Sequence, residues 1–171
     1  MDLTKYLRDV PDFPKPGIIF KDISPLLASP EALEECIRQM AALVENEKID
    51  RVAGIESRGF LFGAPLAMRL GCGFTPIRKP GKLPWRTNRV EYVLEYGTDA
   101  LEIHQDGVEK GHRVLLVDDL LATGGTMKAA ADLVTGIGGE LVGCLFAIEL
   151  AFLPGREKLE NHNIYTVMSI D

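Results

Sequence analysis

Short apolar runs alternate along the chain with longer segments in which apolar residues recur at helical spacing. The runs predict buried strands at 51–55, 73–77, 114–117, 141–150 and 164–170. The periodic segments predict helices at 29–47, 60–70, 127–134 and 156–160. Because strands and helices alternate, the chain is predicted to be an α/β protein with a central parallel sheet and helices on both faces.

The N-terminal part of the chain interrupts this alternation. Residues 1–10 have the composition of a short helix, and a segment broken by proline and glycine follows. Proline fixes its own backbone angle and lacks an N–H group, so this segment cannot form one long regular element. We therefore expect an N-terminal arm over residues 1–28.

A basic segment interrupts the pattern a second time. Residues 78–89 are rich in Arg and Lys, contain Pro and Gly and have no periodicity, which predicts a long mobile loop. Residues 90–96 are expected to be the strand that returns from it, and 101–104 can be strand or loop. The predicted organisation is one domain over 1–171, comprising the arm at 1–28 and a core at 29–171 with a flexible loop at 78–96.

The most informative stretch is 114–126. Asp118 and Asp119 follow an apolar run, and Ala-Thr-Gly-Gly-Thr then opens a helix. Ligands of open α/β sheets bind outside the carboxyl ends of the strands. A glycine-rich turn at a helix N-terminus offers free N–H groups to a phosphate, and the two acids could hold sugar hydroxyls or a metal ion.

Other interpretations of this stretch fit less well. A P-loop ATPase needs a G-x-x-x-x-G-K-[ST] loop and a dinucleotide fold needs G-x-G-x-x-G, and the chain has neither. A purely structural turn stays open, although two adjacent buried acids would be unfavourable without a partner.

A second strand–turn–helix junction follows 51–55. Its turn reads Glu56-Ser57-Arg58-Gly59. Arginine can hold a phosphate through two parallel hydrogen bonds, so this turn could be a second anion site. An ordinary loop with a surface arginine is the alternative.

Composition limits the partners and the compartment. The net charge of −6 argues against non-specific nucleic-acid binding, so an anionic substrate would have to meet a local basic cluster. Cys36, Cys72 and Cys144 lie far apart in apolar surroundings and are expected to be free thiols of a reducing cytosol. No apolar run approaches membrane-spanning length, so we expect a soluble, cytoplasmic protein.

The stretch 117–126 resembles the ribose-phosphate motif of the type I phosphoribosyltransferases, in the form found in the adenine phosphoribosyltransferase family. Further resemblance to that family lies in 13–27, 54–60, 78–82 and 94–97, and it extends over 13–158. It implies the type I phosphoribosyltransferase fold with a small N-terminal hood. The implied reaction belongs to purine salvage: adenine and 5-phosphoribosyl 1-pyrophosphate (PRPP) give AMP and pyrophosphate.

The resemblance also implies roles for individual residues. Asp118 and Asp119 would bind the ribose, and the 5′-phosphate would be bound by Ala122, Thr123, Gly124, Gly125 and Thr126. Pyrophosphate would be bound by Glu56, Ser57, Arg58, Arg78 and Lys79, with a cis peptide bond between Glu56 and Ser57. Adenine would be held by Ile19, Phe20, Lys21 and Leu150. Catalysis would involve Arg58, Lys79, Lys82, Glu95 and Tyr96, with Glu95 handling a proton on the base.

Mg²⁺ is the implied cofactor, held mainly through PRPP or pyrophosphate rather than by protein ligands. The implied assembly is a homodimer without nucleic-acid or membrane partners. Two rival functions stay open. One is phosphoribosyl transfer to another nucleobase. The other is a regulator that senses PRPP and binds DNA, which would need a basic face or a further domain.

Overall fold

The computed structural model describes residues 1–94 and 97–171, which form two compact units, Met1–Gln39 and Met40–Asp171. The expected organisation as one domain stays a prediction.

The first unit contains a small antiparallel sheet and short helices. Its elements are η1 (Leu3–Tyr6), β1 (Arg8–Pro11), β2 (Ile19–Asp22), α1 (Ser24–Ala28) and the beginning of α2 (Pro30–Leu43). The helix predicted at 1–10 is wrong beyond Tyr6, because the following residues pair with β2 instead. Helix α2 also ends before the predicted residue 47, since 44–47 form turns.

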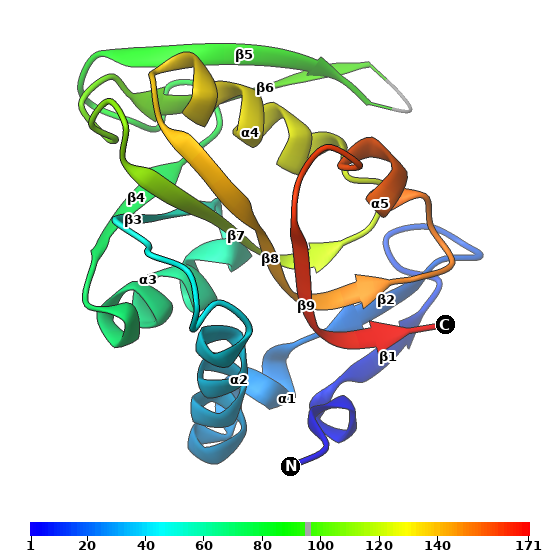
Figure 1. Cartoon of the computed structure of the whole chain (residues 1–171). Coiled ribbons are helices and arrows are strands. Elements are labelled where there is room, and N and C mark those ends of the chain that lie inside the picture. The colour runs from blue at the N-terminus through cyan, green and yellow to red at the C-terminus, as the bar shows by residue number, and fades with distance from the viewer. Residues whose placement is uncertain (95–96) are drawn as a thin grey trace. The chain divides into compact units, whose positions relative to one another are not determined.

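The second unit is built on a parallel sheet with the order β4-β3-β7-β8-β9 (Figure 1). Its strands are β3 (Arg51–Ile55), β4 (Gly73–Ile77), β7 (Arg113–Leu121), β8 (Glu140–Leu150) and β9 (Ile164–Ile170). All five predicted strands are present, and three have the predicted bounds. The α/β class with a central parallel sheet is therefore confirmed.

Helices cover both faces of this sheet, as predicted. They are α3 (Arg58–Leu70), α4 (Gly125–Gly136) and the short α5 (Gly155–Lys158). The chain runs from β3 through α3 to one edge of the sheet, and from β7 through α4 toward the other. Right-handed crossovers in opposite directions put their helices on opposite faces. Figure 1 accordingly shows the sheet between α3 and α4. The strand order reverses between β3 and β7, which is where open sheets of this kind bind ligands.

A β-hairpin replaces part of the predicted flexible loop. Strand β5 (Thr87–Val93) pairs with the antiparallel β6 (Thr98–His104). The loop predicted at 78–89 therefore ends at residue 86, and the predicted start of the returning strand at residue 90 is wrong by three residues. The ambiguous residues 101–104 are strand. Val90 and Tyr92 pack against the buried core that includes α4, which accounts for the early start of β5. The predicted roles of Glu95 and Tyr96 fall outside the described residues.

Among the described helices, none is long and apolar enough to cross a membrane. The three cysteines are free thiols, and burial raises the pKa of Cys36 and of Cys144 to about 12. Thiols with such pKa values stay protonated and unreactive at neutral pH.

Candidate active site

Two acids lie inside strand β7, near its carboxyl end. The prediction that the strand stops at Val117 is wrong, because Leu120 and Leu121 continue the pairing with β8. The Asp119 carboxylate forms an ion pair with the guanidinium of Arg58, at the first position of α3. The Asp118 carboxylate accepts a hydrogen bond of 2.9 Å from the Asp119 N–H.

Asp118 is poorly solvated. Burial, followed by the charge of Asp119, raises the pKa of Asp118 well above its ordinary value. A carboxyl group in this state gains from any ligand that donates hydrogen bonds to it, as sugar hydroxyls do.

The turn after β7 encloses a cavity of about 100 Å³. Asp118 lines it together with Leu120, Leu121, Ala122, Thr123, Gly124, Gly125, Thr126, Met127 and Phe146. Gly124 has a left-handed φ of 80° and precedes the first residue of α4, so the cavity adjoins the N-terminus of a helix. Free N–H groups and the helix dipole favour an anion there.

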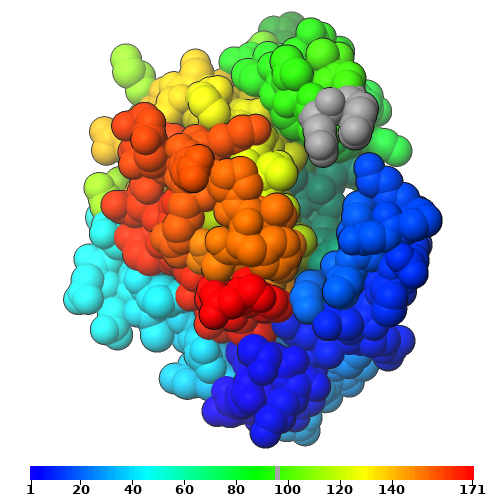
Figure 2. Space-filling model, turned by 90° about the vertical axis from the view of Figure 1, so that its right-hand side faces the viewer, coloured from blue at the N-terminus to red at the C-terminus, as the bar shows by residue number. Residues whose placement is uncertain are grey.

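Helix α5 packs against this turn. A Cβ atom on Gly124 would lie 2.7 Å from the Gly155 carbonyl oxygen, and one on Gly155 would lie 2.4 Å from the Ala122 carbonyl oxygen. Figure 2 shows the orange residues around α5 against the yellow residues at the start of α4. Two glycines therefore allow the turn and α5 to touch backbone to backbone.

An ion pair fixes α5 to the sheet. Arg156 Nε and Nη2 donate to the two carboxylate oxygens of Glu149 at 2.5 and 2.7 Å, and Thr166 Oγ1 donates to one of them at 3.2 Å. The hydrogen bonds from Arg156 lower the pKa of the buried Glu149. Our sequence reasoning missed this pair, although an acid near the end of an apolar strand was a usable signal.

A second cavity, of about 270 Å³, lies at the junction of β3 and α3. It is lined by Ile55, Glu56, Ser57, Arg58, Lys79, Asp118, Asp119 and Thr126. The predicted cis peptide bond between Glu56 and Ser57 is present. Glu56 Oε1 accepts hydrogen bonds from Arg78 Nε at 3.2 Å and from the Lys79 N–H at 2.6 Å, so the start of the basic segment is tied to this junction.

The chain matches a known family of proteins. Residues 22–171 match the model of the phosphoribosyl transferase domain family. The adenine phosphoribosyltransferase of Acetivibrio thermocellus is 57% identical over 169 residues, covering 98% of this chain and 99% of that protein. The chain belongs to the adenine phosphoribosyltransferase family.

Solved structures of this family agree with the chain over nearly its whole length. The crystal structure of adenine phosphoribosyltransferase from Thermoanaerobacter pseudethanolicus has a TM-score of 0.97 and 53% identity, covering 99% of this chain and 98% of that one. The Saccharomyces cerevisiae adenine phosphoribosyltransferase, complexed with an imino-altritol bisphosphate and adenine, has a TM-score of 0.92 and 40% identity, with 97% and 96% covered. The type I phosphoribosyltransferase fold is thus confirmed.

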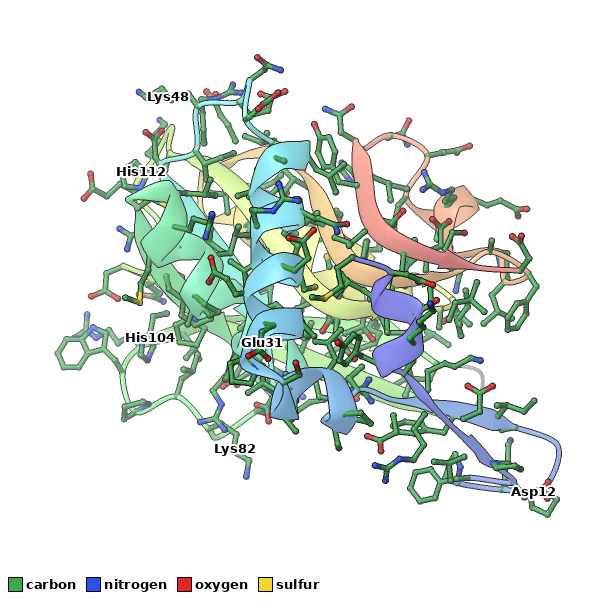
Figure 3. All side chains as sticks on the ribbon, turned by 90° about the horizontal axis from the view of Figure 1, so that it is seen from below. Asp12, Glu31, Lys48, Lys82, His104 and His112 are labelled. Carbon is green, nitrogen blue, oxygen red and sulfur yellow. The ribbon has the colours of Figure 1, made fainter. Side chains whose placement is uncertain are left out.

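Most residues that the family resemblance assigned to PRPP line the two cavities. Arg78 is the exception: it contacts Glu56, and its Cζ lies 6.0 Å from the ring centroid of Phe60. Lys82, predicted to act in catalysis, lines neither cavity and is exposed. Figure 3 shows Lys82 at the outer edge of its loop, with its side chain directed away from the ribbon. The catalytic role of Lys82 stays a prediction.

The residues assigned to adenine lie in both units. Phe20 of β2 packs edge-to-face on Phe13 at 5.1 Å between ring centroids, Ile19 beside it is exposed, and Lys21 Nζ donates to Asp9 at 2.6 Å. Leu150 is the last residue of β8. The shared role of these residues stays a prediction.

The donor set at the cavities is suited to a metal that arrives with its substrate. Within 1–94 and 97–171, no group of three His, Cys, Asp or Glu side chains is arranged to hold a metal ion. The two carboxylates of β7 are hard oxygen donors. Mg²⁺ commonly binds through one or two carboxylates together with substrate phosphates, so these residues fit it.

Proposed function

We propose that the two cavities carry out the reaction of this family, the transfer of the phosphoribosyl group from PRPP to adenine, giving AMP and pyrophosphate. The chain is then a pentosyltransferase of purine salvage. The observation that carries the proposal is the joining of a helix-N-terminal anion site, two acids and a basic anion site at the reversal of strand order between β3 and β7. PRPP has a chemical group for each.

The ribose 5-phosphate half of PRPP would occupy the turn after β7. Backbone N–H groups and hydroxyls of 122–126 would bind the 5′-phosphate. Asp118 and Asp119 would accept hydrogen bonds from the ribose hydroxyls. As the bond to pyrophosphate breaks, positive charge grows on the ribose, and the nearby carboxylates stabilise that charge.

The leaving group would occupy the junction of β3 and α3. Arg58 and Lys79 neutralise charge on the departing pyrophosphate, and the backbone at Glu56 and Ser57 positions it. An adenine ring nitrogen attacks the anomeric carbon from the opposite side. Exclusion of water by the basic segment would protect the reactive carbon from hydrolysis.

Mg²⁺ would be held by the pyrophosphate and ribose oxygens with help from Asp118 and Asp119, and when bound it supplies positive charge that neutralises the phosphates.

We assign adenine binding to Ile19, Phe20, Lys21 and Leu150. Glu95 would handle a proton on the purine and Tyr96 would order the segment around it. We further propose that the chain forms a homodimer in the cytoplasm. Light scattering, which measures the mass of the assembly, tests the dimer.

A panel of nucleobases tests the proposed substrate. With PRPP and Mg²⁺, adenine should give AMP with a kcat/KM at least about a hundredfold above that of hypoxanthine, guanine, xanthine or orotate, because a buried site made for one hydrogen-bonding pattern rejects others. Chromatography of the nucleotide products measures this. Preference for another base would assign the chain to a different substrate, and PRPP binding without turnover of any base would favour the PRPP-sensing regulator.

A further inference from the structure

We infer that Asp99 is a positioning residue that serves as the internal counter-anion of Lys79 in the ligand-free chain. When pyrophosphate binds, Lys79 leaves Asp99 and pairs with the pyrophosphate. The inference rests on the proposed function only in taking the cavity at β3 and α3 as the pyrophosphate site. It adds Asp99 and Tyr92, residues of the β5–β6 hairpin, to those that set the affinity of that site.

Lys79 is held at both ends. Its backbone N–H donates to Glu56 Oε1 at 2.6 Å, which anchors it at the cavity. Its ammonium group forms an ion pair with the Asp99 carboxylate and a hydrogen bond of 3.2 Å with the Tyr92 hydroxyl. The side chain that lines the pyrophosphate cavity is therefore already neutralised by the hairpin.

The hairpin register makes this arrangement specific. Tyr92 and Asp99 are directly paired across β5 and β6, so their side chains lie on the same face of the hairpin. The Tyr92 hydroxyl lies 3.4 Å from Asp99 Oδ2 and 3.4 Å from Thr126 Oγ1. Tyr92 thus connects the lysine and its counter-anion to the turn that we assign to the 5′-phosphate.

The ion pair is partly shielded from water. The side chains of Lys79 and Asp99 are 38% and 29% exposed, so their attraction exceeds that of a fully solvated pair. Burial lowers the pKa of Lys79, but hydrogen bonds to Asp99 and Tyr92 outweigh it and raise the pKa overall. The hydrogen bond from Lys79 lowers the pKa of Asp99. Both groups are charged at neutral pH.

Asp99 differs from the acids at the other cation of the cavity. Arg58 pairs with Asp119, which itself lines the cavity and can turn to a substrate hydroxyl. Asp99 does not line the cavity; its carboxylate contacts Lys79, the Tyr92 hydroxyl and the N–H of Ala100. A polyanion entering the cavity must compete with Asp99 for the lysine and is also repelled by its charge.

Replacing the Asp99 carboxylate by an amide tests whether its negative charge weakens pyrophosphate binding, because the amide removes the charge and changes the hairpin little. Asp99→Asn keeps a hydrogen-bond acceptor for Lys79 and removes the charge. We expect it to lower the dissociation constant for pyrophosphate, measured by calorimetry with Mg²⁺, roughly three- to tenfold. Glu91→Gln is the matched control, because it removes one negative charge from the same hairpin but belongs to an exposed pair with Arg89. It should leave the dissociation constant within twofold.

A double-mutant cycle ties the gain to the lysine. In a Lys79→Gln background, Asp99→Asn should lose most of its effect on pyrophosphate affinity. Asp99→Ser, which removes the carboxylate with a different side chain, should tighten binding in the same direction and serves if Asp99→Asn does not fold. Circular dichroism confirms that each variant is folded before its affinity is compared.

The outcomes distinguish this inference from the proposed function. Unchanged or weaker pyrophosphate binding in both Asp99 variants, or an equal gain in the Lys79→Gln background, overturns the counter-anion role and leaves AMP formation untouched. Tighter binding in a protein that makes no AMP supports the counter-anion and contradicts the proposed function. A wild-type chain that does not bind pyrophosphate contradicts both.

Discussion

At the scale of single residues, Asp118 illustrates what sequence reasoning reaches and what it does not. Its place beside Asp119 and before a glycine turn predicts a ligand site, because these neighbours are local in the chain. Its pKa is raised first by burial under distant elements, whose extent could not be predicted from the sequence, and then by the adjacent charge of Asp119. The contacts of Tyr92, Asp99 and Arg156 could not be predicted either, because strand pairing and helix packing determine them.

Asp118→Asn should make the ligand-free chain more stable at pH 7.5. A carboxyl whose pKa is higher in the folded than in the unfolded state destabilises the folded state once it ionises, and this effect is relieved as pH falls toward the ordinary value. The amide removes the effect, so the midpoint of thermal unfolding should rise by about 2–4 °C, the shift produced by ~1 kcal/mol in a domain of this size.

Scanning fluorimetry across pH measures the difference, which should shrink on acidification toward pH 4. Asp132→Asn is the control, since that carboxylate is half-exposed in a pair with Lys128 and its loss should have little effect. An Asp118→Asn variant less stable than the wild type at pH 7.5, or a gain that grows at low pH, would contradict this explanation of the pKa.

At the scale of elements, the bounds of short buried strands could be predicted from the sequence, whereas the start of the hairpin strand β5 could not. Strands β3, β4 and β9 have their predicted bounds because each is a compact apolar run beside a turn. Strand β5 alternates apolar with polar and charged residues, so its start is set by pairing with β6 and packing on α4 rather than by local pattern. Likewise, nothing local in α5 indicates that it touches the turn after β7.

The contact between α5 and the turn after β7 is testable through one methyl group. In Gly155→Ala the new Cβ meets the Ala122 carbonyl oxygen, so the turn or α5 must shift. We expect a loss of about 1–3 kcal/mol in the free energy of unfolding and a KM for PRPP raised more than tenfold. Denaturant unfolding and initial rates measure both.

Gly136→Ala provides the matched comparison. A Cβ there has open space, and alanine favours the helical conformation, so stability and KM should stay unchanged or improve slightly. Equal behaviour of the two alanine variants would show that α5 does not support the turn.

At the scale of the molecule, the reversal of strand order between β3 and β7 brings two separate turns together. Each turn alone suggested only an anion site, with an ordinary loop as the alternative. Their common cavity, which includes Arg58, Asp119 and Thr126, could be expected from the rule for open sheets, but its lining could not be derived from the sequence alone. The match to the adenine phosphoribosyltransferase family over nearly the whole chain supports one substrate spanning both turns.

Single-turnover formation of AMP tests this account most directly. Enzyme in excess over PRPP, mixed with adenine and Mg²⁺ and quenched over time, should convert PRPP to equal amounts of AMP and pyrophosphate. The double variant Asp118→Asn/Asp119→Asn should slow this step by at least about a hundredfold, because it removes the charge next to the developing cation. Absence of AMP from the wild-type chain, or an unchanged rate in the double variant, would contradict the assignment of the site.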